Sequence, residues 1–126
     1  MTDEIVMYLC VRTDLPMSPG KVAAQVGHGV QLAIRRAEVL TVTKNSDDLR
    51  NWEAGDYAKV ILGGDKRDFE KLCKLASEDA TLGSRLVKVI DNGRTEVPAG
   101  SMTILAFVPM RKSEAKKWVG RLRLYR

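Results

Sequence analysis

Three polar side chains that can take part in chemistry lie at helical spacing near the start of the sequence. Lys21, Gln25 and His28 are four and three residues apart, and at about 100° per residue they share one side of a helix. An ammonium, an amide and an imidazole can stabilise a developing negative charge or exchange a proton with water. This polar stripe is expected to point away from the apolar side of its helix, so a solvated face without chemistry is the alternative.

A second polar group fills the segment that follows a predicted strand. Asp91 ends that strand, which is where α/β sheets gather their ligand-binding groups. Arg94, Thr95 and Ser101 offer hydrogen-bond donors suited to phosphate or ribose oxygens. The alternative is a long turn in which Asp91 and Thr95 bond their own backbone.

The sequence lacks the signatures of several other kinds of site. His28 is the only histidine, and Cys10 and Cys73 are far apart in the sequence. We therefore expect two free thiols and no protein-bound zinc site. There is no glycine-rich phosphate loop, no dinucleotide-binding fingerprint and no nucleophile elbow around a serine.

Apolar patterns along the chain alternate between strands and helices. Strands are predicted at 5–11, 60–62, 86–90 and 103–108, with a further edge strand at 121–125. Ser18 and Pro19 are typical of the N-cap and first residue of a long helix. Further helices are predicted over 47–53 with Ser46 as cap, from Asp65 with Gly83 in the turn beyond it, and from Ser113 as cap to Trp118.

This order of elements predicts one α/β domain over residues 1–126. It favours three layers, with helices on both faces of a mixed sheet. Strands 86–90 and 103–108 are joined by about a dozen residues, too few for a covering helix, so one antiparallel connection is expected. Gly27 and Gly29 reduce the bulk of the long helix, and they mark contact either with the chain's own sheet or with a second chain.

Positive charge is concentrated at the end of the sequence. The net charge is +5, and residues 111–126 carry seven Lys or Arg against one acid, Glu114. That end includes Lys116 and Lys117, and it favours contact with a polyanion, nucleic acid first. Solvated charges that only keep the region soluble are the alternative.

No membrane or export signal is expected from the first residues. The apolar run Ile5–Val11 is far shorter than the roughly 20 residues of a membrane span. Asp3 and Glu4 precede it, where a secretory signal would carry basic residues. These features favour a cytoplasmic protein.

Four segments resemble, in order, the motifs of a known enzyme family. Residues 11–28, VRTDLPMSPGKVAAQVGH, resemble the V-R-x-D-L and M-x-x-G-K-x-A-A-Q-x-x-H motifs of the second, archaeal and eukaryotic type of peptidyl-tRNA hydrolase. Residues 91–101, DNGRTEVPAGS, resemble its D-A-G-x-T-x-[IV]-x-x-G-[ST] segment. Residues 52–62 and 120–124 are similar to its W-x-x-x-G-Q-x-K-V-V-L and G-x-L-K-L motifs.

The resemblance implies a mixed four-stranded sheet with flanking helices, in a homodimer without metal or organic cofactor. It also implies hydrolysis of peptidyl-tRNA, which recycles tRNA from aborted translation. It places the family's motif residues on Lys21, Gln25, His28, Asp91 and Thr95. Lys21 would stabilise the oxyanion, while Asp91 or His28 would act on the attacking water, and the sequence leaves open which of the two does so. Substrate contacts are expected from Gln25, Arg94, Thr95, Ser101, Lys116 and Lys117.

Three positions depart from the family pattern. Pro19 stands where many members carry a basic residue, Asn92 where they carry Ala, and Asp56 where they carry Gln. These departures keep a second hypothesis open, a non-catalytic RNA-binding or adaptor domain on the same scaffold. A purely structural oligomerisation domain is a third hypothesis.

Overall fold

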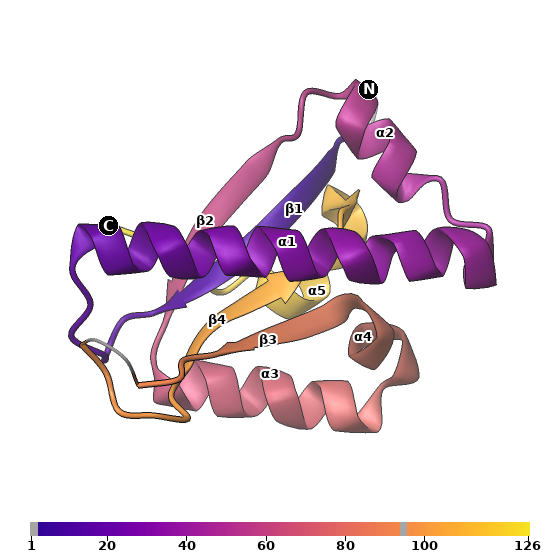
Figure 1. The fold of residues 1–126 in the computed structure, drawn as a ribbon. Helices are drawn as coiled ribbons and strands as arrows, with labels where there is room; N and C mark the ends of the chain where they lie inside the picture. The colour runs from indigo at the N-terminus through magenta and orange to yellow at the C-terminus, as the bar shows by residue number, and fades with distance from the viewer. Residues whose placement is uncertain (1–2, 94–95) are drawn as a thin grey trace.

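A mixed β-sheet forms the centre of the computed structural model, which describes residues 3–93 and 96–126 (Figure 1). The strands follow the order β3-β4-β1-β2-β6, and β5 pairs with β1 off this path. The strands are β1 (Ile5–Arg12), β2 (Lys59–Gly64), β3 (Leu86–Ile90), β4 (Met102–Phe107), β5 (Met110–Arg111) and β6 (Arg123–Leu124). The helices are α1 (Pro19–Lys44), α2 (Asp48–Ala54), α3 (Lys66–Glu78), α4 (Ala80–Arg85) and α5 (Lys112–Val119).

The prediction of a four-stranded sheet is wrong, because the described residues form six strands. The four longest strands, β1 to β4, lie close to their predicted positions, and the predicted edge segment 121–125 contains β6. The unpredicted strand β5 has only two residues. A two-residue strand has no alternation that a sequence pattern can reveal, and this one forms because the backbone of β1 lies beside it.

The strand directions bring three carboxyl ends to one edge of the sheet. β1 and β2 are parallel, whereas β4 is antiparallel to both β1 and β3. β3 therefore points the same way as β1 and β2, and the antiparallel connection predicted between β3 and β4 is confirmed. Only residues 13–18 separate β1 from α1, so α1 begins at this edge, which we call the carboxyl edge.

Alternate side chains of β1 enter two different core clusters, because successive residues of a strand point to opposite faces. Leu9 packs in a cluster that includes Ala33 of α1. Cys10 packs in the other cluster, with Phe69 of α3 and Ala115 of α5. Helices α1, α3 and α5 thus bury apolar side chains of β1 that would be exposed in an isolated sheet.

Two predicted helix starts are confirmed. Ser18 has extended backbone and its Oγ accepts the N–H of Lys21 at 3.2 Å, with Pro19 as the first helical residue. Asp65 is the N-cap of α3 and forms a capping box with Asp68. The Asp65 side chain accepts the backbone N–H of Asp68, and the Asp68 side chain accepts the backbone N–H of Asp65, both at 3.0 Å.

One local prediction holds in part, and two are wrong. Asp47 rather than Ser46 is the residue directly before α2, but the Oγ of Ser46 accepts the N–H of Asp48 in the first turn at 3.3 Å. Ser113 lies inside α5, and its hydroxyl donates to Asp3, a partner 110 residues away that no local pattern could indicate. Gly83 lies inside the short helix α4 rather than in a turn, because the Asp79 carboxylate caps a helix directly before it.

Both cysteines are free, as predicted, with Cys10 buried and Cys73 partly buried. Burial raises the pKa of the Cys10 thiol to about 12, so it stays protonated and acts as a small apolar core residue. Across residues 3–93 and 96–126, no helix is both long enough and apolar enough to pass through a membrane.

Gly29 faces the sheet of its own chain. A Cβ at this position would lie 3.1 Å from side-chain carbons of Leu9 and Ile104 and 3.4 Å from the Cβ of Ala106. A Cβ at Gly27 would meet nothing within 4 Å. Gly29 therefore allows α1 to lie close to β1 and β4, which is one of the two roles that the sequence left open.

This difference between the two glycines gives a stability prediction. Gly29→Leu is expected to lower the free energy of unfolding by about 1–3 kcal/mol, because the larger side chain overpacks the contact with the sheet. Gly27→Leu gains the same helix propensity, about 1 kcal/mol, without a clash and is expected to be neutral or stabilising. Urea unfolding of both variants measures this, and equal effects would contradict it.

Candidate active site

A pocket of about 590 Å³ opens at the carboxyl edge, between the first turns of α1 and the end of β3. It brings together side chains from both polar groups of the sequence, and we call it the carboxyl-edge pocket. Its lining includes Ser18, Lys21, Ala24, Gln25, His28, Ile90, Asp91, Asn92 and Glu96. Residues separated by about 70 positions in the chain thus become neighbours, since α1 and β3 meet at one edge of the sheet.

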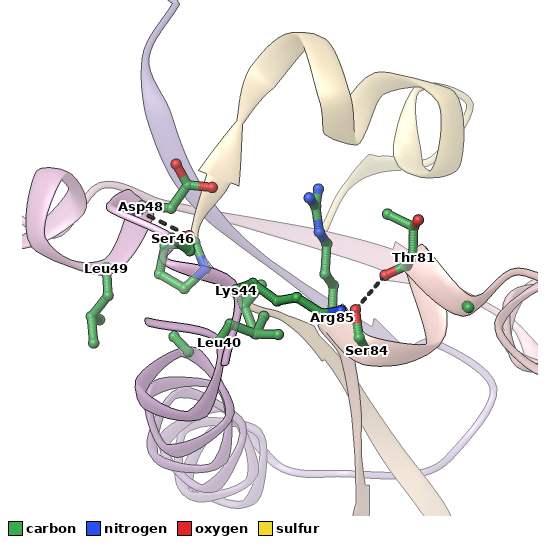
Figure 2. Close-up of a pocket in the computed structure, with 12 residues that line it drawn as sticks. Leu40, Lys44, Ser46, Asp48, Leu49, Thr81, Ser84 and Arg85 are labelled. Atoms are coloured by element: carbon green, nitrogen blue, oxygen red, sulfur yellow. Dashed lines mark hydrogen bonds between the residues drawn. The ribbon is translucent and has the colours of Figure 1, made fainter. Parts of the chain in front are cut away.

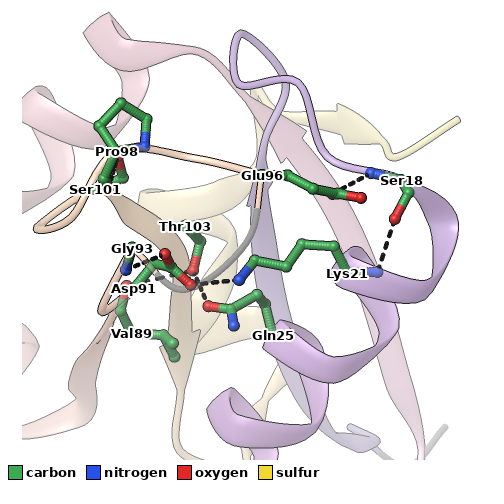
Figure 3. A network of polar contacts seen from close by, with 10 residues as sticks. All are labelled: Ser18, Lys21, Gln25, Val89, Asp91, Gly93, Glu96, Pro98, Ser101 and Thr103. Carbon is green, nitrogen blue, oxygen red and sulfur yellow. Dashed lines mark hydrogen bonds and ion pairs between the residues drawn. The ribbon is translucent and has the colours of Figure 1, made fainter.

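An ion pair between Lys21 and Asp91 lies at the centre of this pocket (Figure 3). The Lys21 ammonium donates to Oδ1 of Asp91, and the two side chains keep only 11% and 5% of their surface exposed. Oδ2 of Asp91 accepts the N–H of Gly93 at 2.6 Å. The bond from Lys21 lowers the pKa of Asp91 most; burial opposes it, and the Gly93 N–H lowers the pKa further.

The backbone around Asp91 holds its carboxylate in place. Its N–H donates to the carbonyl of Ser101 and its carbonyl accepts the N–H of Gly100, both at 2.8 Å. Gly93 has φ +73°, and a Cβ there would lie 2.6 Å from the Cβ of Ala99. Only glycine fits at this position, so the turn that supplies the second N–H to Asp91 depends on it.

The prediction that Gln25 points away from the core is wrong. Gln25 is buried, and its Oε1 accepts the hydroxyl hydrogen of the fully buried Thr103 at 2.6 Å (Figure 3). The buried side of α1 includes Val22, Gln25 and Gly29, at spacings of three and four residues. Gly29 has no side chain and so did not count as apolar in the sequence, although it lies within the buried face. Thr103 satisfies the amide, which makes its burial tolerable.

His28 remains exposed and lines the pocket beside Lys21 and Gln25. The predicted stripe is therefore divided. His28 is exposed to solvent, and the side chain of Lys21 is largely buried. Gln25, between them, connects α1 to β4 through its hydrogen bond with Thr103.

Glu96 is a site residue that the sequence analysis did not single out. Its Oε2 accepts the backbone N–H of Ser18 at 2.7 Å, and hydrogen bonding to Ser18 lowers the pKa of Glu96. Glu96 thereby connects the segment after β3 to the start of α1. The two residues are 78 positions apart, and a single Glu in a polar loop gives no sequence signal of such a contact.

The remaining candidates from the loop are placed differently. Arg94 and Thr95 fall outside the described residues. The Ser101 hydroxyl donates to the carbonyl of Pro98 at 2.7 Å, and Ser101 is not part of the pocket lining. Its backbone carbonyl, rather than its hydroxyl, contributes to the site by binding the N–H of Asp91.

The two candidate lysines of α5 lie at another surface. Lys116 and Lys117 line a separate pocket together with Trp118 and Arg121. The Lys117 ammonium lies 4.6 Å from the centre of the Trp118 ring, a cation–π contact. A role for these lysines would therefore be in binding a large substrate at a distance from Asp91.

Another pocket, of about 430 Å³, lies near the C-terminal end of α1 (Figure 2). It combines apolar Leu40 with the charged side chains of Lys44, Asp48 and Arg85. Arg85 donates to Glu114 at 2.8 Å, and burial, with the nearby Glu114, raises the pKa of Asp48. Among the described residues, none of the candidate site residues lines this pocket.

In the described segments 3–93 and 96–126, no three His, Cys, Asp or Glu residues are grouped closely enough to hold a metal ion.

Comparison with known proteins gives consistent matches over almost the whole chain. The family profile described as "Peptidyl-tRNA hydrolase PTH2" matches residues 5–125. A Drosophila melanogaster protein named "Probable peptidyl-tRNA hydrolase 2" is 36% identical over 124 residues, which cover 98% of this chain and 63% of that protein. The Homo sapiens "Peptidyl-tRNA hydrolase 2, mitochondrial" is 34% identical over 122 residues, covering 97% and 65% of the two chains.

An archaeal relative has nearly the same length as this chain. The "Peptidyl-tRNA hydrolase" of Methanothermobacter thermautotrophicus is 33% identical over 116 residues, covering 92% of this chain and 96% of that protein. The chain therefore spans just under two thirds of the animal relatives and nearly all of the archaeal one.

The lowered pKa of Asp91 predicts how its contribution to stability depends on pH. A carboxylate whose pKa falls on folding stabilises the protein fully above its unfolded pKa of about 4, and this stabilisation is lost as the pH falls through the lower folded pKa. The difference in unfolding free energy between wild type and Asp91→Asn is therefore expected to be largest above pH ~5 and to shrink below pH ~4. Urea unfolding between pH 2 and 7 measures it, and a constant difference would contradict the prediction.

Proposed function

The chain belongs to the peptidyl-tRNA hydrolase PTH2 family, and we propose that it hydrolyses the ester bond between peptide and tRNA in peptidyl-tRNA. The observation that carries this proposal is the nearly buried pair of Lys21 and Asp91 in a pocket that His28 also lines. An ammonium, a carboxylate and an imidazole around one pocket are sufficient for ester hydrolysis by water, without a covalent intermediate.

Lys21 stabilises the oxyanion of the tetrahedral intermediate in this proposal. Its ammonium is held at one position by Asp91, although a lysine side chain is long and flexible. Because both groups are largely removed from solvent, the ammonium interacts with a developing negative charge more strongly than it would in water. Asp91 thus acts first as the residue that positions Lys21.

The lowered pKa of Asp91 supports His28 as the group that acts on the water. A general base works best when its pKa lies near the working pH, and a carboxylate that binds an ammonium and an N–H accepts protons weakly. Histidine is the side chain most often used for proton transfer at neutral pH. His28 is exposed at the pocket, where a water can lie between it and the ester.

The other candidates are proposed to bind the substrate. The Oε1 of Gln25 is occupied by Thr103, which leaves its amide N–H groups for the pocket. Arg94 and Thr95 would donate hydrogen bonds to phosphate or ribose oxygens of the substrate. Ser101, at the end of the same loop, would also contact the substrate. The exposed Lys116 and Lys117 would contact the phosphate backbone of the tRNA.

Assembly and location are further parts of the proposal. We expect a homodimer, whose interface does not depend on Gly29, since that residue packs on its own sheet. A cytoplasmic location is proposed as well, although relatives named mitochondrial are among the matches. No cofactor is required for the chemistry described above.

A non-catalytic RNA-binding or adaptor domain is the competing function. Two departures from the family motifs favour it: Asn92, which follows Asp91, and Pro19, at the start of α1. The two functions are separated by incubating the purified protein with a model peptidyl-tRNA. Release of tRNA supports the enzyme, whereas tight tRNA binding without turnover would support the adaptor.

The ion pair predicts the kinetics of two variants. Lys21→Ala and Asp91→Asn are each expected to lose on the order of a hundredfold in kcat, because the first removes the ammonium and the second removes the carboxylate that positions it. The double variant is expected to lose little more than the worse single variant, since the pair acts as one unit. Lys74→Ala, an exposed lysine of α3, is the matched control and should keep its activity. Full activity in either single variant would exclude that residue from the mechanism.

The basic region predicts how tRNA affinity depends on salt. Replacing Lys116 and Lys117 with Gln is expected to weaken binding and to flatten the slope of log affinity against log salt by up to about one unit for each lost phosphate contact. Filter binding of tRNA at several salt concentrations measures the slope. An unchanged slope would show that these lysines face away from the RNA.

A further inference from the structure

β3 has a free edge. Within the described residues it pairs with β4 alone. The N–H of Val108 donates to the carbonyl of Arg85 at 2.9 Å, directly before the paired part of β3. Because bonded and non-bonded pairs alternate between antiparallel strands, Val87 bonds to β4 while Lys88 and Ile90 turn their backbone N–H and C=O groups to the free edge. Two consecutive positions are thus available to pair with another strand.

One stripe of α1 runs beside this free edge. His28, Leu32, Arg35 and Val39 follow one another at spacings of four, three and four residues, so they share one side of the helix. Leu32 and Val39 are apolar but remain 41% and 53% exposed. Together with residues 86–88 of β3, this part of α1 lines a pocket of about 500 Å³, which we call the β3 groove. Figure 1 shows α1 and β3 with nearly parallel axes and opposite chain directions.

The β3 groove and the carboxyl-edge pocket are lined by neighbouring parts of α1 and β3. His28 and Ile90 line the pocket that contains Asp91. Leu32 lies one helical turn beyond His28, and Lys88 lies two residues before Ile90. The same two elements therefore border the groove and the proposed site, one after the other along each element.

We propose that the β3 groove binds the peptide part of the substrate as an additional extended strand, an inference that rests on the proposed hydrolysis. Backbone bonds to Lys88 and Ile90 would give affinity, and the apolar side chains of Leu32 and Val39 would contact alternate residues of the peptide. Recognition through the backbone suits a substrate whose peptide can have any sequence.

The position of the ester sets the direction of the bound peptide. The ester is at the C-terminus of the peptide, so that end must lie beside Asp91, at the carboxyl end of β3. The peptide therefore runs parallel to β3. β3 has five residues, and at about 3.3 Å per residue this length accommodates about four residues of peptide before the groove ends.

Peptide length is the variable that tests the inference. The substrates are tRNA carrying one N-acetylated amino acid and the same tRNA carrying an N-acetylated tetrapeptide with the same final residue. For wild type, kcat/KM is expected to be on the order of tenfold higher for the tetrapeptide, the effect of about two net hydrogen bonds and the apolar contacts. Equal kcat/KM values for the two substrates would overturn the proposal that the β3 groove binds peptide, and would leave the proposed hydrolase function intact. No hydrolysis of either substrate would overturn both proposals.

Two variants remove different parts of the groove. Lys88→Pro deletes an N–H that β4 does not use, which an edge strand tolerates, and Leu32→Glu places a charge in the apolar wall on an exposed helix position. Both are expected to bring the ratio of kcat/KM for the two substrates toward one. Val42→Glu is the matched control, because Val42 is 81% exposed on α1 and lies outside the groove. Variants that keep the wild-type ratio while thermal unfolding shows them folded would overturn the proposal.

Hydrogen exchange provides a readout that does not depend on turnover. A tetrapeptide joined through an amide to 3′-amino-adenosine cannot be hydrolysed as an ester and serves as the probe. It is expected to slow amide exchange at Lys88 and Ile90, and unchanged exchange at saturation would overturn the proposal. A second copy of the chain is the other possible occupant of this edge. A wild-type dimer that becomes monomeric in Lys88→Pro on ultracentrifugation would identify that occupant and overturn the peptide site.

Discussion

The ion pair between Lys21 and Asp91 is the interaction on which the rest of the site depends. Two charges that are almost removed from water are tolerable only when they are paired and hydrogen-bonded. The first turn of α1 must therefore stay against the end of β3. Ser18 stabilises this contact through two hydrogen bonds. Its Oγ accepts an N–H of the first turn of α1, and its own N–H donates to Glu96 in the segment after β3.

The order of the strands gives β3 two properties at once. Because β4 lies between β1 and β3 and runs against both, the carboxyl end of β3 meets that of β1, and β3 also becomes an edge. The first property brings Asp91 to the start of α1. The second leaves the backbone groups of Lys88 and Ile90 without a partner strand among the described residues, Lys88 at the β3 groove and Ile90 at the pocket that contains Asp91. The bond between Gln25 and Thr103 and the close packing at Gly29 fix α1 across this arrangement.

Several features of the fold could be predicted because they depend on neighbouring residues. The four long strands have apolar runs that only burial can explain, and Ser18 with Pro19 is a strong helix start. The predictions failed where a distant partner decides the outcome. Strand β5 requires the backbone of β1, the hydroxyl of Ser113 binds Asp3, and Gln25 is buried because Thr103 satisfies it.

The sequence by itself determined the types of chemical group and their local spacing, including the helical phase of Lys21 and His28 and the position of Asp91 at a strand end. Its motifs also indicated the family. Only the tertiary structure decided which groups meet. The pairing of Lys21 with Asp91, the contact of Glu96 with Ser18 and the free edge of β3 all join segments far apart in the chain. Such contacts depend on sheet order and strand direction, which no local pattern encodes.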